Sequence, residues 1–422
     1  MYGNGVAIGP RWRAFSLHLA CARHGSWIVA RVRLLLASLV ASAAGTAWAE
    51  VVPWLYDVDV VVASQGDAER RRAAGAALTQ VLGRVTGLRE LSFGAKVDGA
   101  IRESERYYVR YGYATRDVQP VDGGDMVSET RLNIHFERGT LLELLRETGL
   151  PVWSADRPSV LVWVVLERGA LSLEARGAGS SQEGAFSRGA RGARPSQERA
   201  REVVSSTPVG MAEEVLSAMH REARRRGVML TFPLMDLEDR NLTAADLWGR
   251  FWTAIMVASR RYSRDLMLLG RIAADPGGGF TSRWEIMSPS GEKELAVRFD
   301  HRGVSAAGAA GQAVHRLADA MARRFAVRGG DLDTIALTVR GAQTVRGYAA
   351  VLAHLQSREY INRVEVSAVD PEALHLKLHS QSTRDQLVEL LVMGGYLSVS
   401  RTASPTPSLA APRLELTWMG AR

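Results

Sequence analysis

The hydrophobic pattern after residue 50 opens with a strand and a helix. The run VVPWLYDVDVVVA at 51–63 alternates apolar and polar positions and then becomes continuously apolar, which is typical of a buried β-strand. Apolar residues then recur with helical spacing from Asp67 to about Val85. Asp67 is a good N-terminal cap and Gly87 a good C-terminal stop. The pattern therefore predicts a β-α unit.

A hairpin, a short helix and a further strand follow. The strands at 107–116 and 128–138 flank Asp122-Gly123-Gly124-Asp125, which is a strong turn signal. A helix at 140–147 precedes SVLVWVVLE at 159–167, whose continuous apolar character predicts a fully buried strand. The order β-α-β-β-α-β predicts a ferredoxin-like sandwich over residues 50–169.

The segment 170–207 interrupts this regular pattern. It is rich in Gly, Ser, Arg and Ala and contains one aromatic residue. Such a composition cannot bury enough apolar surface to offset the entropy of ordering the chain. We therefore expect a disordered Gly/Arg-rich insertion.

A middle α/β domain with an antiparallel sheet is predicted for residues 208–330. One helix is predicted over 208–226, and another begins at Thr243 and carries aromatic residues at helical spacing. Three antiparallel strands and a long Ala-rich helix follow at 265–274, 280–288, 294–299 and 305–327.

Residues 331–422 repeat the first pattern with one additional strand. The strands are expected at 335–339, 364–369, 374–379, 396–400 and 414–418, with helices at 345–357 and 383–392. We therefore expect an α+β protein in which two ferredoxin-like (β-α-β-β-α-β) sandwiches, at 50–169 and 331–422, flank the middle α/β domain.

Residues 1–49 are expected to be an N-terminal extension and a cleaved signal peptide. The stretch RVRLLLASLVASAAGTAWA at 31–49 has a basic start, a short apolar run and small residues at Ala47 and Ala49. These features predict export to the periplasm and cleavage after Ala49. Val32 is a candidate translation start, and the alternative is a genuine extension. A signal that is not cleaved would instead tether the protein to the membrane.

The charge balance argues against nucleic-acid binding. The whole chain of 422 residues has a formal charge of +8, but the first 49 residues contain five arginines and no acid. The remainder is close to neutral, with 48 basic against 45 acidic residues. A protein that neutralises many phosphates needs a larger excess of cations. No later stretch is long and apolar enough to predict a membrane span.

No catalytic signature is present in the sequence. The chain lacks G-x-S-x-G, H-E-x-x-H, the P-loop pattern and G-x-G-x-x-G. Ser290 and Lys293 match S-x-x-K, but they lie in a Pro-Gly turn instead of a helix. His375 and His379 alternate with apolar residues, so on a strand they stand roughly 13 Å apart. We therefore expect no catalytic residue, no metal and no cofactor.

The acidic loop MDLEDRN at 235–241 is the strongest remaining candidate for a ligand site. Its carboxylates could hold a cation or orient a polar ligand, although it lacks the glycine and the distal Glu of an EF-hand. Three residues that end the following helix could line the same edge. The alternative is that all of these side chains only cap and solvate. The candidate residues are Asp236, Glu238, Asp239, Arg260, Arg261 and Tyr262.

Three longer strings carry a resemblance to a known family. They are YDVDVVVASQGDAERRRAAGAALTQVLGRVTG at 56–87, TFPLMDLED at 231–239 and ASRRYSRDLMLLGRI at 258–272, the last followed by Trp284. The chain resembles an uncharacterised family of secreted proteobacterial proteins, a domain of unknown function (number 2066). The resemblance implies a signal peptide and an envelope location, and it supplies no reaction or ligand.

These observations favour a periplasmic, non-enzymatic binding or scaffold protein of the cell envelope with an envelope protein as partner. One alternative is an envelope glycan or peptidoglycan hydrolase that uses the acidic loop 236–239. Such an enzyme needs two carboxylates about 5–9 Å apart in a cleft, which three acids crowded in one loop match poorly. A second alternative is a lipid-surface binder that uses the basic insertion.

Overall fold

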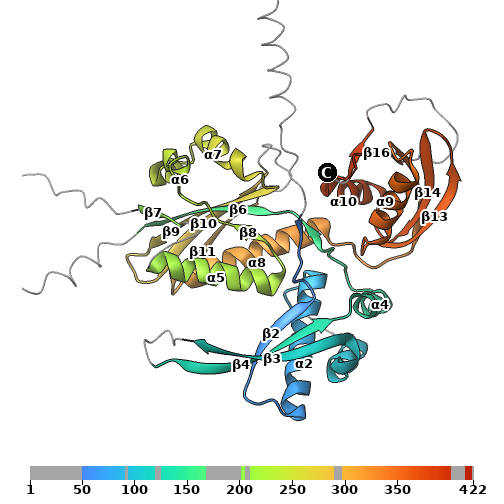
Figure 1. Ribbon diagram of the computed structural model, residues 1–422. Helices are drawn as coiled ribbons and strands as arrows, with labels where there is room; N and C mark the ends of the chain where they lie inside the picture. The colour runs from blue at the N-terminus through green and yellow to red at the C-terminus, as the bar shows by residue number, and fades with distance from the viewer. Residues whose placement is uncertain are drawn as a thin grey trace, which may run out of the picture. The chain divides into compact units, whose positions relative to one another are not determined.

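The computed structural model describes residues 50–90, 94–118, 125–167, 201–204, 210–288, 297–400 and 414–420. These residues fall within one compact unit, Ala47–Arg422. The expected signal peptide, most of the expected disordered insertion and the tip of the predicted turn at 122–124 lie outside the described residues. The α+β class is confirmed by the order of helices and strands (Figure 1).

The N-terminal part contains a three-stranded antiparallel sheet with the order β2-β4-β3. The apolar side of α2, including Leu78, Val81 and Leu82, is fully buried against β2 and β4. Gly87 ends α2 in the left-handed region at φ 71° and donates its N–H to the carbonyl of Gly83. The elements are β2 (Asp57–Val62), α2 (Asp67–Thr86), α3 (Ala95–Arg102), η1 (Ser104–Tyr107), β3 (Tyr108–Val118), β4 (Val127–Phe136) and α4 (Arg138–Thr148).

The strand predicted at 159–167 exists, but its expected place in a ferredoxin-like sandwich is wrong. As β6 (Val160–Glu167) it lies inside a second sheet, with the order β11-β10-β9-β6-β7 and β8 also paired to β6. All eight of its residues are buried. A strand that is apolar on both faces needs a layer on each side, and the outer face of the three-stranded sheet is largely exposed. In the second sheet a layer of helices packs on each face of β6.

Helices cover the two faces of this six-stranded sheet. Val162 and Val164 pack with residues of α5 (Met211–Arg226) and α8 (Ala306–Phe325), whereas Trp163 packs with residues of α6 (Ala244–Gly249) and α7 (Trp252–Ser259). The remaining strands are β7 (Arg201–Val203), β8 (Leu230–Thr231), β9 (Leu266–Ala274), β10 (Phe280–Met287) and β11 (Val297–Gly303). A small separate sheet joins β1 (Glu50–Val51) to β5 (Asp156–Arg157).

Three local expectations for the middle region need correction. The sheet is mixed and not antiparallel, because β6 runs parallel to both β9 and β8. Residues 201–203, expected to be disordered, form β7 and pair with β6. The single helix expected after Thr243 is two helices, since Arg250 adopts a left-handed φ of 62° between α6 and α7. The predicted cap at Thr243 is confirmed as a capping box with Asp246.

The C-terminal part forms a five-stranded sheet with the order β13-β14-β12-β16-β15. The place beside β12 is taken by β16, which runs parallel to it, so the expected ferredoxin-like order is altered by the additional strand. The elements are β12 (Asp333–Arg340), α9 (Val345–Gln356), β13 (Ile361–Val369), β14 (Ala373–Ser380), α10 (Arg384–Met393), β15 (Leu397–Val399) and β16 (Leu414–Trp418).

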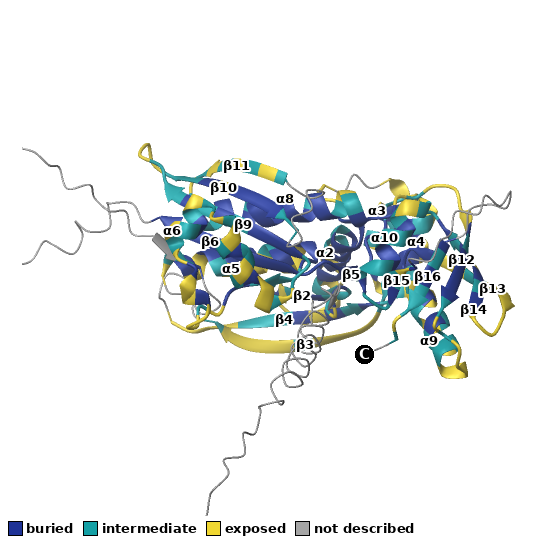
Figure 2. Cartoon of the chain, turned by 90° about the horizontal axis from the view of Figure 1, so that it is seen from above, coloured by how far each residue is buried: buried dark blue, intermediate teal, exposed yellow. Residues whose placement is uncertain are grey.

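Burial differs strongly between the sheets. In Figure 2 the strands β6, β9 and β10 are largely dark, whereas β3 forms a long exposed band. Within the described residues, no helix combines the length and apolar character needed to cross a bilayer.

Candidate functional site

The acidic loop between β8 and α6 is held by ion pairs with Arg261. Both carboxylate oxygens of Asp236 lie 2.7 Å from the two terminal nitrogens of the Arg261 guanidinium, a two-point pairing. Asp236 also accepts the backbone N–H of Asp239 at 3.2 Å. The hydrogen bonds from Arg261 hold the pKa of Asp236 well below its usual range. This carboxylate is therefore ionised, and it is occupied by its own neighbours.

Asp239 is the buried member of the loop. It is 0 % exposed, and its Oδ2 accepts the hydroxyl of Tyr262 and the N–H of Met235, the latter at 2.9 Å. Its Oδ1 lies 3.3 Å from Arg261. Burial and the hydrogen bond to Asp239 raise the pKa of Tyr262 to about 12. Asp239 thus connects the loop to η5 (Arg260–Tyr262) at the end of α7.

The other two candidates of the loop are more exposed. Glu238 lies 3.3 Å from Arg261 but its side chain is 70 % exposed, and Arg260 is exposed with no side-chain contact to the loop. The structure therefore brings together Asp236, Glu238, Asp239, Arg261 and Tyr262, but not Arg260. Among the described residues, no three His, Cys, Asp or Glu side chains are grouped so as to hold a metal ion.

The two C-terminal histidines are separate, as their alternation predicts. Both lie on β14 with Lys377 between them. His375 pairs with Asp370 at 2.8 Å, and His379 lies 3.4 Å from Glu365. Each imidazole therefore has its own carboxylate on the sheet face. Ser290 and Lys293 lie outside the described residues.

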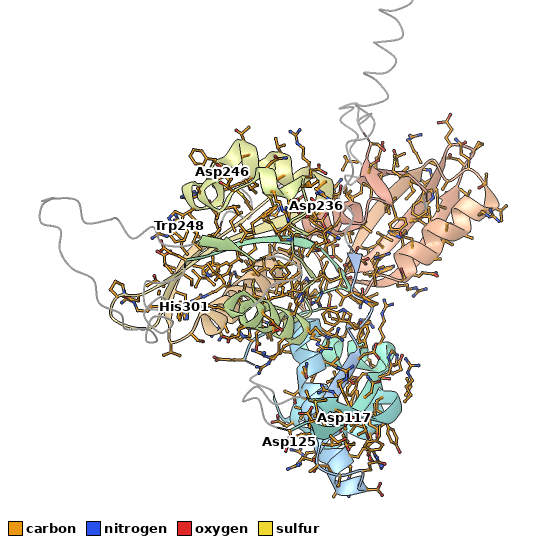
Figure 3. The ribbon with its side chains drawn as sticks, turned by 60° about the vertical axis from the view of Figure 1, so that its left-hand side comes forward. Asp117, Asp125, Asp236, Asp246, Trp248 and His301 are labelled. Carbon is orange, nitrogen blue, oxygen red and sulfur yellow. The ribbon has the colours of Figure 1, made fainter. Side chains whose placement is uncertain are left out.

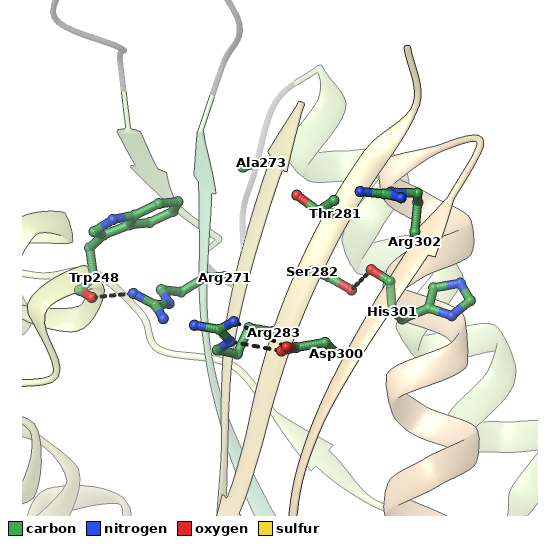
Figure 4. A pocket seen from close by; sticks show the side chains of 9 residues that line it. All are labelled: Trp248, Arg271, Ala273, Thr281, Ser282, Arg283, Asp300, His301 and Arg302. Carbon is green, nitrogen blue, oxygen red and sulfur yellow. Dashed lines mark hydrogen bonds and ion pairs between the residues drawn. The ribbon is translucent and has the colours of Figure 1, made fainter. Parts of the chain in front are cut away.

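A second candidate site is a groove on the six-stranded sheet, which the sequence patterns did not predict. Its cavity of about 610 Å³ lies beside Trp248 of α6, over strands β9, β10 and β11 (Figure 4). Arg271, Arg283 and Asp300 are successive neighbours across these strands, and Ala273, Thr281 and Arg302 form the next row. We call this surface the arginine groove, and its lining residues are Trp248, Arg271, Ala273, Thr281, Ser282, Arg283, Asp300, His301 and Arg302.

The strand period places Arg271, Ala273, Thr281, Arg283, Asp300 and Arg302 on one face, whereas Ser282 and His301 belong to the alternate face. Met267 and Leu269 of β9 pack with residues of α6 and α7, and Arg271 is the next residue on that same face. Figure 3 shows Trp248 and Asp246 near these helices, on the same side as Asp236. The arginine groove is therefore the part of this sheet face that the two short helices leave uncovered.

Arg271 is the least compensated cation of the groove. Its guanidinium donates to the carbonyl oxygen of Trp248 at 2.7 Å and lies 5.2 Å from the centre of that indole. No carboxylate of the described residues lies within ion-pair distance of it. Partial burial, together with repulsion from Arg283 and Arg250, lowers its pKa. A positive charge without a carboxylate partner therefore faces the cavity.

The neighbouring charges are paired. Arg283 contacts both carboxylate oxygens of Asp300, at 2.7 and 3.0 Å, and Arg302 lies 2.9 Å from Asp275. Three arginines and one acid line the cavity, so the groove carries an excess of positive charge. Arg283 lowers the pKa of Asp300, which is therefore ionised and is no proton donor near neutral pH.

The groove contains a serine and a histidine that do not form a nucleophile–base pair. The Ser282 hydroxyl donates to the backbone carbonyl of His301 at 3.3 Å. The His301 imidazole points away from Trp248 and Arg271 (Figure 4). This arrangement can bind a polar ligand, and it offers no activated nucleophile.

A second hollow, of about 780 Å³, lies over α6 and α7. Its lining combines apolar side chains such as Phe251 and Val257, which are 59 % and 60 % exposed, with Glu238 and Asp246. The sequence pattern predicted that Trp248, Phe251 and Trp252 lie at helical spacing in one helix. The break at Arg250 is what brings Phe251 to the surface.

Comparison with known proteins finds a family match for the N-terminal part of the chain. Residues 49–154 match the family model described as a domain of unknown function (DUF8605). The match is consistent with the expected resemblance to an uncharacterised family, but it does not confirm the number 2066. No curated protein and no solved structure gives a significant match. Residues 49–154 are thus similar to a family that has no assigned function.

Proposed function

We propose that the protein is an exported, non-enzymatic binding or scaffold protein of the cell envelope, and that the arginine groove holds its ligand. The ligand carries a carboxylate or phosphate group on a sugar or planar ring. The observation that carries this proposal is the positive charge of Arg271, which faces the cavity beside an indole ring and has no carboxylate partner among the described residues.

The electrostatics favour an anion. Partial burial of the charged Arg271 side chain is unfavourable, and repulsion from the nearby cations Arg283 and Arg250 destabilises this charge further. An anionic group placed against Arg271 compensates both effects with charge-assisted hydrogen bonds. Planar guanidinium groups also bind carboxylates and phosphates at two points.

The shape favours a small molecule with one flat face. A cavity of about 610 Å³ is within the range of small-molecule sites. Trp248 provides an aromatic wall on which a sugar or ring can stack. Thr281 on the strand floor adds a hydroxyl that can donate or accept.

The export part of the proposal rests on the sequence. The stretch at 31–49 has the organisation of a cleaved signal, and the matched family region begins at residue 49. That position is next to the expected cleavage site.

A hydrolase using the acidic loop is the less favoured alternative. A general acid needs a raised pKa, whereas the pKa of Asp236 is lowered by Arg261. Asp239 is fully buried among three donors. These carboxylates stabilise the connection between the loop and η5.

The proposal is tested by calorimetric titration of the exported protein with glucuronate, inorganic phosphate and glucose. We expect saturable binding of the two anions, with glucuronate tighter, and no binding of neutral glucose. Arg271→Gln should weaken anion binding by about tenfold or more. Arg298→Gln is the matched control, because Arg298 is on the same sheet face but does not line the groove.

The control should bind within about twofold of the wild type, since an exposed surface charge contributes little. Absence of anion binding in the wild type, or equal binding in Arg271→Gln, would contradict the proposal.

A further inference from the structure

The three-stranded sheet has a long open edge. β3 is its terminal strand, pairs only with β4 among the described residues, and is exposed along most of its eleven residues (Figure 2). Its pairing is regular from Tyr111 to Val118, since the only register shift lies between Tyr108 and Arg110. The backbone groups on the free side of β3 therefore present a ready template for another strand.

This edge lacks most of the features that usually prevent strand addition. Proteins protect edge strands with proline, charged side chains, bulges or short length. β3 is long, contains no proline and no lysine, and has its one irregularity at its start, so its protection rests on the charged residues Arg110, Arg116 and Asp117. Gly112 and Ala114 keep one face of its centre free of large side chains, and a Cβ at Gly112 would meet nothing within 4 Å. An incoming strand can approach closely.

Two arginines mark the edge. Arg110 and Arg116 are exposed on the same face of β3, and neither has an ion pair or a side-chain hydrogen bond among the described residues. The acids of that sheet face are already engaged by the central strand. Asp57 pairs with His135, Asp59 with Asn133, and Glu129 with Arg131.

The two arginines are six residues apart, which corresponds to about 20 Å along a strand. We propose that the β3 edge binds an extended acidic segment of a partner protein as an added strand. Its acidic side chains would face Arg110 and Arg116, and alternate side chains would extend the row of Tyr111 and Tyr113.

A second copy of this chain fits the edge less well. Residues directly opposite in antiparallel strands lie on the same face. The only acid in β3 is Asp117, whose side chain is on the opposite face from Arg110 and Arg116. In the pairing centred on Tyr113, Arg110 of one copy would face Arg116 of the other, which is repulsive. The charges therefore favour a different, acidic partner.

The test uses a labelled nine-residue peptide with two glutamates six positions apart and alternating Thr and Val between them. A matched peptide carries lysines at those two positions. Binding to the full chain is measured by fluorescence anisotropy, and the site is located by amide hydrogen exchange. We expect the glutamate peptide to bind more tightly than the lysine peptide and to protect amides within 108–118.

The double variant Arg110→Glu with Arg116→Glu should weaken the glutamate peptide about fivefold to tenfold and reverse the preference between the peptides. Arg363→Glu on β13, an edge strand of the five-stranded sheet, is the matched control and should change neither affinity. Peptide protection outside β3, an unchanged preference in the double variant, or a dimer in sedimentation that the double variant abolishes would each overturn the proposal.

Discussion

Buried cations hold several elements of this protein together at the scale of single residues. Arg157 is fully buried, lies 3.7 Å from the centre of the Trp153 ring, and donates to the carbonyl oxygens of Arg84, Trp153, Ser154 and Gly227. Burial lowers its pKa. Carbonyl oxygens compensate this charge, whereas Arg271 has only one carbonyl and a ring. The contrast is why Arg271, and not Arg157, is the candidate ligand contact.

Asp239 should be the stabilising carboxylate of the acidic loop. Asp239→Asn places an amide among donors that now contact a carboxylate, so we expect a loss of about 1–3 kcal/mol in the free energy of unfolding. Asp236→Asn is the matched change at an exposed position and should have a smaller effect. Urea denaturation of both variants provides the measurement. An equal or larger loss for Asp236→Asn would be inconsistent with this account.

His354 should make stability depend on pH. Burial lowers its pKa to about 4, and its imidazole contacts the rings of Tyr396 and Trp418. An unfolded histidine titrates near 6.5, so between about pH 6.5 and 4 the unfolded state binds the proton first. Stability is therefore complete above pH 6.5 and falls as the pH decreases, by at most about 1.4 kcal/mol per pH unit from this group.

The check is denaturant unfolding of the wild type and His354→Gln across that pH range. The variant should show a shallower loss of stability on acidification. Identical slopes would show that another group controls the pH dependence.

At the scale of elements, strand type and one helix cap were predictable from local pattern. The expected cap at Asp67 is wrong, because Gly66 is the N-cap of α2 and Asp67 is its first helical residue. The buried run of β6 and the Thr243 cap follow from short sequences. The partner of β6 does not, because a strand buried on both faces fits any sheet with two covering layers. The break between α6 and α7 could not be predicted from the sequence either, because an arginine in the left-handed region, unlike a glycine, has no recognisable sequence signal.

The arginine groove was missed for the same reason. Arg271 and Arg283 are twelve residues apart and become neighbours only through the register of β9 and β10. The alternation of polar and apolar positions predicts on which face of its strand each arginine lies. It does not predict which part of that sheet face α6 leaves uncovered. The acidic loop was recognised as a cluster, while its pairing with Arg261 depended on the tertiary fold.

Gly270 should be essential for the packing of β9 on β10. A Cβ at this position would lie 2.2 Å from the Trp284 ring, which is fully buried beside it. Gly270→Ala should therefore destabilise the protein by about 1–3 kcal/mol through overpacking. Gly112→Ala on β3 meets open space and should be nearly neutral. Thermal unfolding distinguishes the two, and similar midpoints would contradict this packing.

At the scale of the whole molecule, the proposed export would determine in which compartment a ligand or partner is met. We expect cleavage after Ala49, so that Edman sequencing of the exported protein reads Glu-Val-Val-Pro. Small residues at Ala47 and Ala49 fit the subsites of a signal peptidase. A mature chain that retains Trp27 or Trp12 would refute this cleavage site.

The whole fold is proposed to present Arg271 to an anionic ligand. The most direct measurement follows the arginine side-chain Nε–H resonances by NMR while inorganic phosphate is titrated into the protein. We predict a saturable shift of the Arg271 resonance, with Arg298 unchanged. An Arg271 resonance that does not shift, or a uniform and non-saturable shift of the resonances of all exposed arginines, would contradict this prediction.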